Sequence, residues 1–143
     1  MKLIVDVNVI LSALVKEGTS FKVFALNSIL KKFEFYAPEF MLSEFNKHKE
    51  KILKISKLKR EVFEKILELI FSQIEIVPSN IFSDFIPKAE KIVRDKKDVH
   101  YVALALALNS PIFSGDPDLK EVKVIKVYSP RELLEILLSE KEV

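Results

Sequence analysis

The sequence predicts an α/β protein, a three-layer α/β/α sandwich with a mostly parallel central sheet. Two observations lead to this prediction. Short apolar, β-branched runs alternate along the chain with longer helical segments, as they do in proteins built from βαβ units. The first run, residues 2–6 (KLIVD), is apolar at successive positions up to its last residue, which is typical of a strand buried on both faces of a parallel sheet.

The composition is that of a globular domain. A length of 143 residues without repeat or Gly/Ser linker predicts a single domain, residues 1–143. The absence of cysteine excludes disulfides and a thiolate nucleophile, and two histidines disfavour a closed zinc site. A net charge of +2 is too small to indicate nucleic-acid binding by itself. No apolar run reaches the roughly 20 residues of a membrane span, so we expect a cytoplasmic protein without membrane association.

The first half of the chain alternates strand and helix signals. Glu17 and Gly18 interrupt the helical pattern, and Thr19 is expected to cap the helix that follows. Pro38 suits the first turn of another helix. The expected elements are a helix from Asn8, a helix through 21–32, a strand over 33–37, and helices over 38–56 and 57–73.

The second half is expected to contain a strand over 74–77, a helix near 87–94, a helix within DVHYVALALALN (98–109), and strands over 111–114 and 122–127 joined by a turn at GDPDLK. The helix within 98–109 is apolar on all sides, so it should be buried, with alanines allowing close approach to the sheet. The last helix has the clearest start: Ser129, Pro130 and Glu132 form a capping box before an apolar stripe.

Four carboxylates stand where a ligand site would form in such a sheet. Asp6 ends the first strand, Asp116 follows the strand over 111–114, Asp98 begins the buried helix, and Glu44 lies on the helix after the second strand. Strand carboxyl ends collect ligands in parallel sheets, so these acids are expected to converge.

Each acid also has a structural interpretation. Asp6 and Asp98 are suited to helix caps, and Asp116 with Asp118 suits an ordinary turn. Glu44 suits the solvated edge of a helix. Carboxylates brought together repel one another unless a cation keeps them ionised. Because the candidate ligands are oxygens, that cation is expected to be Mg²⁺ or Mn²⁺, and such ions serve phosphodiester hydrolysis.

These segments resemble the PIN-domain ribonuclease family, and in particular its VapC-like toxin group. The matching pieces, in the order of the family, are LIVDVNVIL (3–11), PEFMLSEF with Glu44, DVHYVALALAL with Asp98, and PIFSGDPDL with Asp116. The resemblance implies a metal-dependent endoribonuclease with catalytic Asp6, Glu44, Asp98 and Asp116, of which Asp6, Asp98 and Asp116 hold the metal. It implies RNA as the substrate, cut to a 5′-phosphate and a 3′-hydroxyl.

The resemblance also implies supporting residues and leaves two positions open. Asn8, Ser114 and Asp118 match family positions that support the site. Asp95 competes with Asp98 for the third acidic role. Glu39 and Glu50 compete with Glu44. Glu44 either completes the metal shell or orients the attacking water.

Partners are expected from the resemblance and from two surface patterns. Many relatives are the toxin of a toxin–antitoxin pair, and dimers are common among them. The basic stretch over 47–60 either steers RNA or is a solvated lysine face. Phe21 and Phe24 either seat an antitoxin helix or belong to the core.

Two other functions compete with the nuclease. A haloacid-dehalogenase-like phosphatase would use Asp6 as nucleophile, but that family has a second acid two residues later, where this chain has Asn8. A non-catalytic PIN-fold protein that binds RNA or a partner is the alternative from another functional class.

Overall fold

In the part of the chain that the structure describes, the central sheet has five strands, and every neighbouring pair in it is parallel. The structure is a computed structural model that describes residues 1–16 and 18–139. The strand order is β3-β2-β1-β4-β5, which confirms the predicted α/β class and the parallel sheet. The strands are β1 (Lys2–Val5), β2 (Glu34–Pro38), β3 (Ile74–Val77), β4 (Ile112–Phe113) and β5 (Val127–Tyr128).

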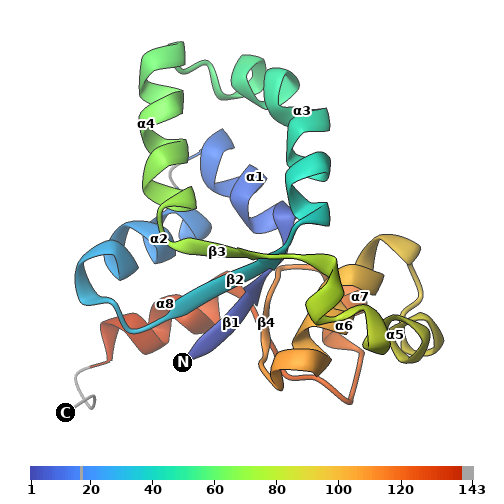
Figure 1. Cartoon of the computed structure of the whole chain (residues 1–143). Helices are drawn as coiled ribbons and strands as arrows, with labels where there is room; N and C mark the ends of the chain where they lie inside the picture. The colour runs from blue at the N-terminus through green and yellow to red at the C-terminus, as the bar shows by residue number, and fades with distance from the viewer. Residues whose placement is uncertain (17, 140–143) are drawn as a thin grey trace.

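Helices connect the strands and cover the sheet (Figure 1). They are α1 (Val7–Val15), α2 (Thr19–Leu30), α3 (Phe40–Ser56), α4 (Arg60–Phe71), α5 (Ile86–Ile92), α6 (Val99–Leu108), α7 (Pro117–Lys120) and α8 (Pro130–Leu138). Three short 3₁₀ turns, η1 (Ser79–Ile81), η2 (Ser83–Phe85) and η3 (Lys96–Asp98), lie between β3 and α6. None of the described helices is both long enough and apolar enough to cross a membrane.

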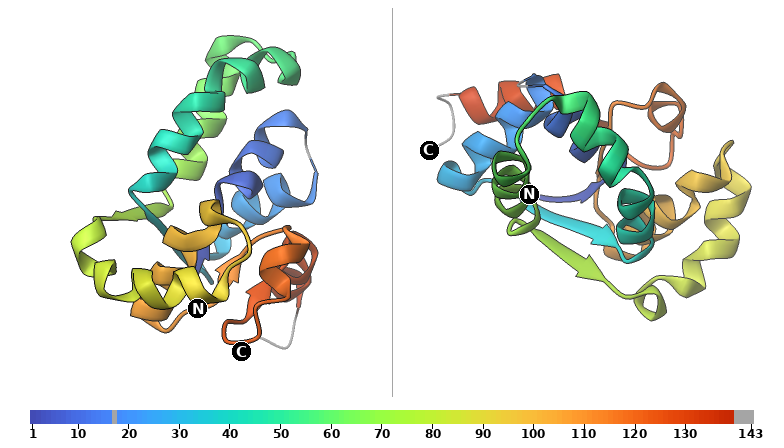
Figure 2. Two further views of the ribbon diagram at one scale, coloured as in Figure 1. Left: turned by 90° about the vertical axis from the view of Figure 1, so that its right-hand side faces the viewer. Right: turned by 90° about the horizontal axis from the view of Figure 1, so that it is seen from above.

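Helices α2 and α8 pack on each other, and α6 packs on β1, β2 and β4 with α5 beside it. Figure 2 shows the two groups on opposite sides of the sheet. Phe24 packs the layer of α2 and α8 onto the sheet. Its ring lies 5.2 Å from that of Phe35 in β2 and 5.7 Å from that of Phe113 in β4. Phe24 is therefore a core residue, and Phe21 is half-buried against the same core.

Helix α6 is buried as predicted, with Tyr101 and the run from Val102 to Ala105 at most 2% exposed. Burial on several sides explains why its apolar residues follow no single stripe. The capping box of α8 is also confirmed: the Ser129 hydroxyl accepts from the Glu132 amide at 3.1 Å, and the Glu132 carboxylate accepts from the Ser129 amide at 2.9 Å.

The start of α2 differs from the prediction. Gly18, and not Thr19, precedes the helix, and no side chain among the described residues caps it. Thr19 is already the first helical residue, so its hydroxyl cannot fill the cap position. The predicted break at Glu17 lies outside the described residues.

Two helix starts were predicted too early. Pro38 is the last residue of β2 and pairs with Val77, because β1 pairs with β2 only as far as Tyr36 and leaves Pro38 without a neighbour on that side. The helix predicted from residue 57 begins at Arg60, since Lys57 closes α3 in the left-handed conformation, with φ of 60°.

The region after β4 departs most from the prediction. GDPDLK contains the one-turn helix α7 instead of an open turn. The strand predicted over 122–127 is reduced to Val127–Tyr128, because the neighbouring strand β4 is itself only two residues long. Among the described residues, 122–126 have no strand partner, so the alternation of their side chains does not produce a strand.

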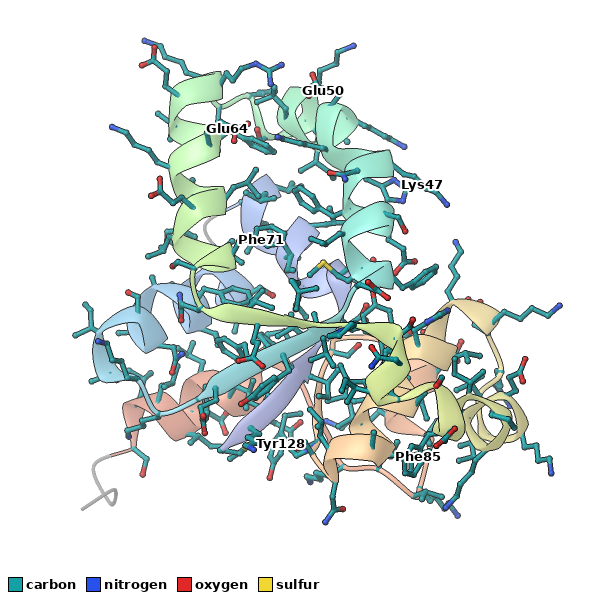
Figure 3. All side chains as sticks on the ribbon, in the orientation of Figure 1. Lys47, Glu50, Glu64, Phe71, Phe85 and Tyr128 are labelled. Atoms are coloured by element: carbon teal, nitrogen blue, oxygen red, sulfur yellow. The ribbon has the colours of Figure 1, made fainter. Side chains whose placement is uncertain are left out.

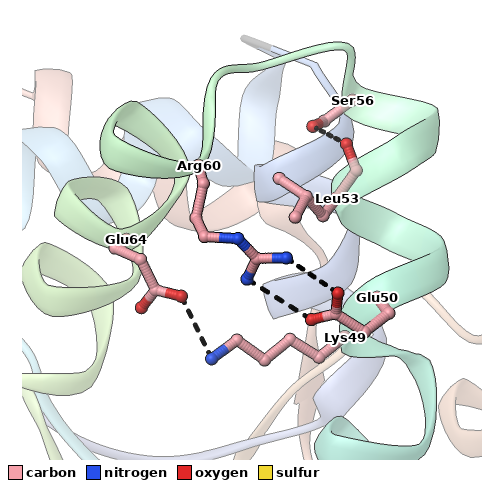
Figure 4. A network of polar contacts seen from close by, with 6 residues as sticks. All are labelled: Lys49, Glu50, Leu53, Ser56, Arg60 and Glu64. Atoms are coloured by element: carbon pink, nitrogen blue, oxygen red, sulfur yellow. Dashed lines mark hydrogen bonds and ion pairs between the residues drawn. The ribbon is translucent and has the colours of Figure 1, made fainter.

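Helices α3 and α4 rise together above the sheet as an antiparallel pair (Figure 1). Phe71 of α4 lies between them and contacts Phe45 of α3, with ring centroids 5.3 Å apart (Figure 3). Two ion pairs link α3 to α4 at the end of the pair that lies away from the sheet: Lys49 with Glu64 at 3.1 Å and Arg60 with Glu50 at 2.9 Å (Figure 4). Part of the basic stretch over 47–60 is therefore used to join the two helices.

Candidate active site

The topology of the sheet places a crevice beside the end of β1. From β1 the chain adds β2 and β3 on one side, and later β4 and β5 on the other. The strand order therefore reverses between β1 and β4, and in open parallel sheets such a reversal leaves room for ligands at the carboxyl ends of the strands. Asp6 and Ser114 follow β1 and β4 at this point.

The register of β1 and β4 brings Asp6 and Ser114 side by side. Val5 pairs with Phe113, so the next residue of each strand leaves the sheet at the same level. The Ser114 hydroxyl donates to Asp6 Oδ2 at 2.7 Å, and Asp6 Oδ1 accepts from the Asn8 amide at 3.3 Å. Asp6 therefore does cap α1, as its structural interpretation required, and its second oxygen is held by Ser114.

Asp116 is tied to the same hydroxyl. Its amide donates to Ser114 Oγ at 3.0 Å, and its own Oδ1 accepts from the Asp118 amide at 2.9 Å, which caps α7. Ser114 thus links the segments that carry Asp6 and Asp116. Asp118 is exposed, and its carboxylate lies 4.0 Å from Arg94.

Asp98 reaches the same region from the N-terminal end of α6. It precedes α6 but its side chain caps nothing, whereas Asp95 caps η3 by accepting from the Lys97 amide at 3.0 Å. Asp98 is also the more buried of the two acids, with 8% of its surface exposed. The cap interpretation therefore fits Asp95 and not Asp98.

Glu44 comes from α3 and is held by a residue that sequence reasoning missed. The Tyr101 hydroxyl donates to Glu44 Oε1 at 2.5 Å, although Tyr101 is otherwise a core residue with 1% of its surface exposed. The two competing glutamates are engaged elsewhere. Glu39 accepts from the Ser79 amide at 2.8 Å, and Glu50 pairs with Arg60.

These acids line one hollow of about 180 Å³, which we call the acidic hollow. It contains all four carboxylates singled out in the sequence, together with Asp95, while Glu39, Glu50, Ser114 and Asp118 are not part of its lining. The remaining lining residues are Val7, Asn8, His48, Lys97 and Tyr101. Of these, Lys97 and Tyr101 were not proposed from the sequence, whereas His48 lies in the basic stretch over 47–60, one helical turn after Glu44.

Burial and mutual repulsion govern the electrostatics of the hollow. Burial, followed by the negative charges of Asp116 and Asp6, raises the pKa of Asp98 to about 7. Burial also raises the pKa of Asp6; the hydrogen bonds from Ser114 and Asn8 oppose this shift, and the charges of Asp116 and Glu44 add to it. Binding of a proton or of a cation in the hollow is therefore favourable, because either would neutralise part of the negative charge.

A hard divalent cation fits the hollow by donor chemistry and by charge. All the acidic donors are carboxylate oxygens, the ligands that Mg²⁺ and Mn²⁺ prefer. The fit is incomplete in geometry, because within residues 1–16 and 18–139 no three Asp, Glu or His side chains stand in an arrangement that would hold an ion. A bound cation would offset the repulsion that the charge of Asp116 exerts on Asp6 and Asp98.

The comparison with solved structures supports the fold. The chain resembles the crystal structure of VapBC2 from Rickettsia felis bound to a DNA fragment from their promoter, with a TM-score of 0.64 and 15% identity. The match covers 90% of this chain and 98% of that one. No curated protein matches the sequence.

The comparison with family models covers most of the chain. The model described as PIN domain matches residues 4–134, which include all four carboxylates and every strand except the first two residues of β1. The chain therefore belongs to the PIN domain family.

Proposed function

We propose that the protein is a metal-dependent endoribonuclease that hydrolyses RNA phosphodiester bonds. One observation carries the proposal: four carboxylates from four separate segments line one hollow at the strand carboxyl ends, in a chain of the PIN domain family. A stable fold gains nothing from this arrangement, since it buries like charges together. Burial of this kind is common where a site performs chemistry.

Asp6, Asp98 and Asp116 are the proposed ligands of Mg²⁺ or Mn²⁺. Asp6 and Asp98 are buried, and the negative charges of Asp116 and Asp6 both act on Asp98. When bound, such a cation neutralises phosphate oxygens and lowers the pKa of water. Ser114 and Asn8 support Asp6 through hydrogen bonds to its two oxygens, and Asp118 supports Asp116 through its amide.

Glu44 is proposed to orient the attacking water. Its Oε1 is held by Tyr101, which leaves Oε2 available to accept a proton from water. In-line attack of that water on phosphorus breaks the bond to the 3′-oxygen, which leaves with a proton as the 3′-hydroxyl. The other fragment keeps the 5′-phosphate.

The substrate must be attracted to a hollow that is lined by acids. His48 on α3 and Lys97 on η3 are exposed lining residues, and Lys97 carries a positive charge at the rim. We propose that these two side chains hold phosphates on either side of the acids, because backbone phosphates dominate the affinity of nucleic-acid complexes.

The toxin of a toxin–antitoxin pair is the proposed biological role. The supporting observation is the similarity to a chain of the VapBC2 structure over 90% of this chain. An antitoxin is accordingly the proposed protein partner, and a homodimer is the proposed assembly. An adjacent reading frame for a small antitoxin would be expected beside the gene.

Asp6→Asn tests the nuclease directly. Asparagine is also a good helix cap, so α1 should keep its start while the charge is lost. Purified wild type should cleave RNA with Mg²⁺ or Mn²⁺, and Asp6→Asn should reduce the rate by at least about 100-fold. The matched control is Asp84→Asn, at an exposed position of η2 outside the acidic hollow. Undiminished cleavage by a folded Asp6→Asn protein would refute the assignment of this site.

A non-catalytic RNA-binding or partner-binding protein of the same fold is the second candidate. The observation that favours it is the lack, among the described residues, of three acids already arranged to hold an ion. Calorimetric titration with Mn²⁺ separates the two candidates. The nuclease should bind Mn²⁺, and Asp116→Asn should weaken the binding; no heat from either protein would favour the binding protein.

A further inference from the structure

Hydrolysis to a 3′-hydroxyl needs a proton for the leaving oxygen, and none of the roles described above supplies it. As the bond to phosphorus breaks, the 3′-oxygen keeps the electron pair and becomes strongly basic. A side chain that donates a proton in that step typically speeds such a reaction by about 10²–10⁴-fold. The donor has to line the acidic hollow and carry a proton that it releases readily near neutral pH.

His48 has the required position. It lies one helical turn after Glu44 on α3, and both residues line the acidic hollow. Side chains at this spacing are about 5–6 Å apart at Cβ, which leaves room for a phosphoryl group between their ends. In an in-line displacement, the attacking and leaving oxygens lie on opposite sides of phosphorus. With Glu44 beside the attacking water, His48 is therefore on the side of the leaving oxygen.

The imidazole of His48 is also free to act. His48 is exposed, and in the part of the chain that the structure describes its ring makes no hydrogen bond or ion pair. The environment of the other histidine, His100, is the opposite. Its ring stacks on that of Phe40, with centroids 4.2 Å apart, and its Nδ1 is buried. Of the two histidines, His48 is therefore the one that can reach a substrate.

The other proton-bearing side chains of the hollow suit this step less well. Tyr101 already donates its hydroxyl to Glu44, and burial raises its pKa, so it holds its proton firmly. An ammonium group such as that of Lys97 is a weaker acid than an imidazolium at neutral pH. Asp98 is a proposed ligand of the cation, and a ligating carboxylate is ionised. Imidazole is also the side chain that most often serves as general acid or base.

We propose that His48 is the general acid that protonates the leaving 3′-oxygen. The inference rests on the proposed function and adds a catalytic residue to it. The oxygen of water bonds to phosphorus while Glu44 takes a proton from that water. The bond to the 3′-oxygen breaks, and that oxygen receives the proton of the His48 imidazolium. Glu44 then releases its proton to solvent and His48 takes one up, which restores the starting state.

A change of leaving group separates proton donation from simple phosphate binding. The bond that wild type cuts in a short RNA is first mapped, and a second RNA is made with sulfur in place of the bridging 3′-oxygen of that bond. A thiolate leaves without a proton, because thiols are far more acidic than alcohols. A 2′-deoxy sugar at this nucleotide of both RNAs prevents attack by the neighbouring hydroxyl. Single-turnover cleavage of both substrates is measured with Mn²⁺.

His48→Asn should slow cleavage of the oxygen substrate by at least about 100-fold and that of the sulfur substrate by less than about fivefold. Asparagine keeps a hydrogen-bond donor for the phosphate but cannot transfer a proton, and its helix propensity is close to that of histidine. Lys97→Ala gives the pattern of a phosphate contact, which is an equal loss with both substrates. Asn46→Ala, at an exposed position of α3 outside the hollow, should leave both rates unchanged.

Calorimetry with Mn²⁺ tests whether His48 is instead a metal ligand, since imidazole often binds divalent cations. His48→Asn should leave the affinity for Mn²⁺ within about twofold of wild type, whereas loss of a ligand-orienting or ligating group costs about tenfold or more. Thermal unfolding of each variant shows whether it is folded.

Three results would overturn the inference: an equal loss with the oxygen and sulfur substrates, no loss with the oxygen substrate, or a large loss of Mn²⁺ affinity in folded His48→Asn. Failure of the proposed function is a different result, namely a wild type that cleaves neither substrate when Mn²⁺ is supplied.

Discussion

Tyr101 donates its hydroxyl proton to Glu44 Oε1 and so joins the buried helix α6 to α3 within the lining of the acidic hollow. The bond spans 57 positions of sequence. The ring of Tyr101 is packed as a phenylalanine would be, with 1% of its surface exposed, so only the hydroxyl needs a partner. Burial, the bond to Glu44 and the charge of Glu44 all raise the pKa of Tyr101, which keeps the hydroxyl protonated as a donor.

Tyr101→Phe is expected to lower the cleavage rate by about tenfold, because a hydrogen bond to a charged group contributes about 1.5–3 kcal/mol. If Tyr101 acts through Glu44, the same substitution in a Glu44→Gln background should have little further effect. The measurement is single-turnover cleavage in all four proteins of this cycle. Tyr128→Phe, in β5, is the matched control. An equal loss in both backgrounds would contradict a positioning role.

Asp98→Asn should alter how stability depends on pH in the absence of divalent cations. The pKa of Asp98 is about 7 in the folded protein and near 3.8 in the unfolded chain. Between these values the unfolded chain holds fewer protons, so this group lowers the free energy of unfolding as pH rises from about 4 to about 7. Asparagine carries no such charge.

The variant should therefore be more stable than wild type by about 1–2 kcal/mol at about pH 8, with a much smaller difference at about pH 4. Urea unfolding at both pH values, with a chelator present, measures this. Asp84→Asn controls for removal of an exposed carboxylate. A difference that does not change with pH would show that repulsion in the acidic hollow does not control stability.

Ser114→Ala should weaken Mn²⁺ binding. The Ser114 hydroxyl donates to Asp6 and accepts from the amide of Asp116, so its loss frees both acids from their common anchor. Groups that orient ligands typically change metal affinity about 10–100-fold when removed. Ser114→Thr keeps the hydroxyl and should restore most of the affinity.

Calorimetry with Mn²⁺ compares these proteins. Ser110→Ala is the control, because Ser110 is equally a buried serine but its hydroxyl donates only to the Leu108 carbonyl. Equal Mn²⁺ affinities for wild type and Ser114→Ala would rule out an orienting role for the hydroxyl.

Lys97→Ala should weaken the binding of single-stranded RNA and reduce its dependence on salt. Loss of one phosphate contact should lower the slope of log K against log salt by about 0.7. Anisotropy titrations at several salt concentrations give the slope. Lys96→Ala removes an equal charge at the preceding residue, which does not line the acidic hollow. Identical slopes for the two variants would indicate a general effect of charge instead of a contact at the rim.

Much of the fold could be predicted from the sequence, because its signals are local. Residues 74–77 form β3, as the apolar run predicted, and α8 begins after Ser129, as the capping box predicted. The errors occur where distant pairing outweighs local preference. Pro38 belongs to a strand because Val77 lies beside it, and most of the strand expected over 122–127 is missing because β4 is short.

The sequence by itself determined the alternation of strands and helices, the all-oxygen set of candidate ligands and the position of an acid after each of two strands. Tertiary structure decided which acids meet. Glu44 lies in the acidic hollow while Glu39 and Glu50 are engaged elsewhere, and the Asp98 side chain caps no helix whereas Asp95 caps η3. The register of β1 and β4 placed Ser114 beside Asp6, 108 residues away in the chain. The physical reason is that periodicity and caps act over one or two turns, whereas hydrogen bonds and repulsion between segments depend on strand register and helix packing.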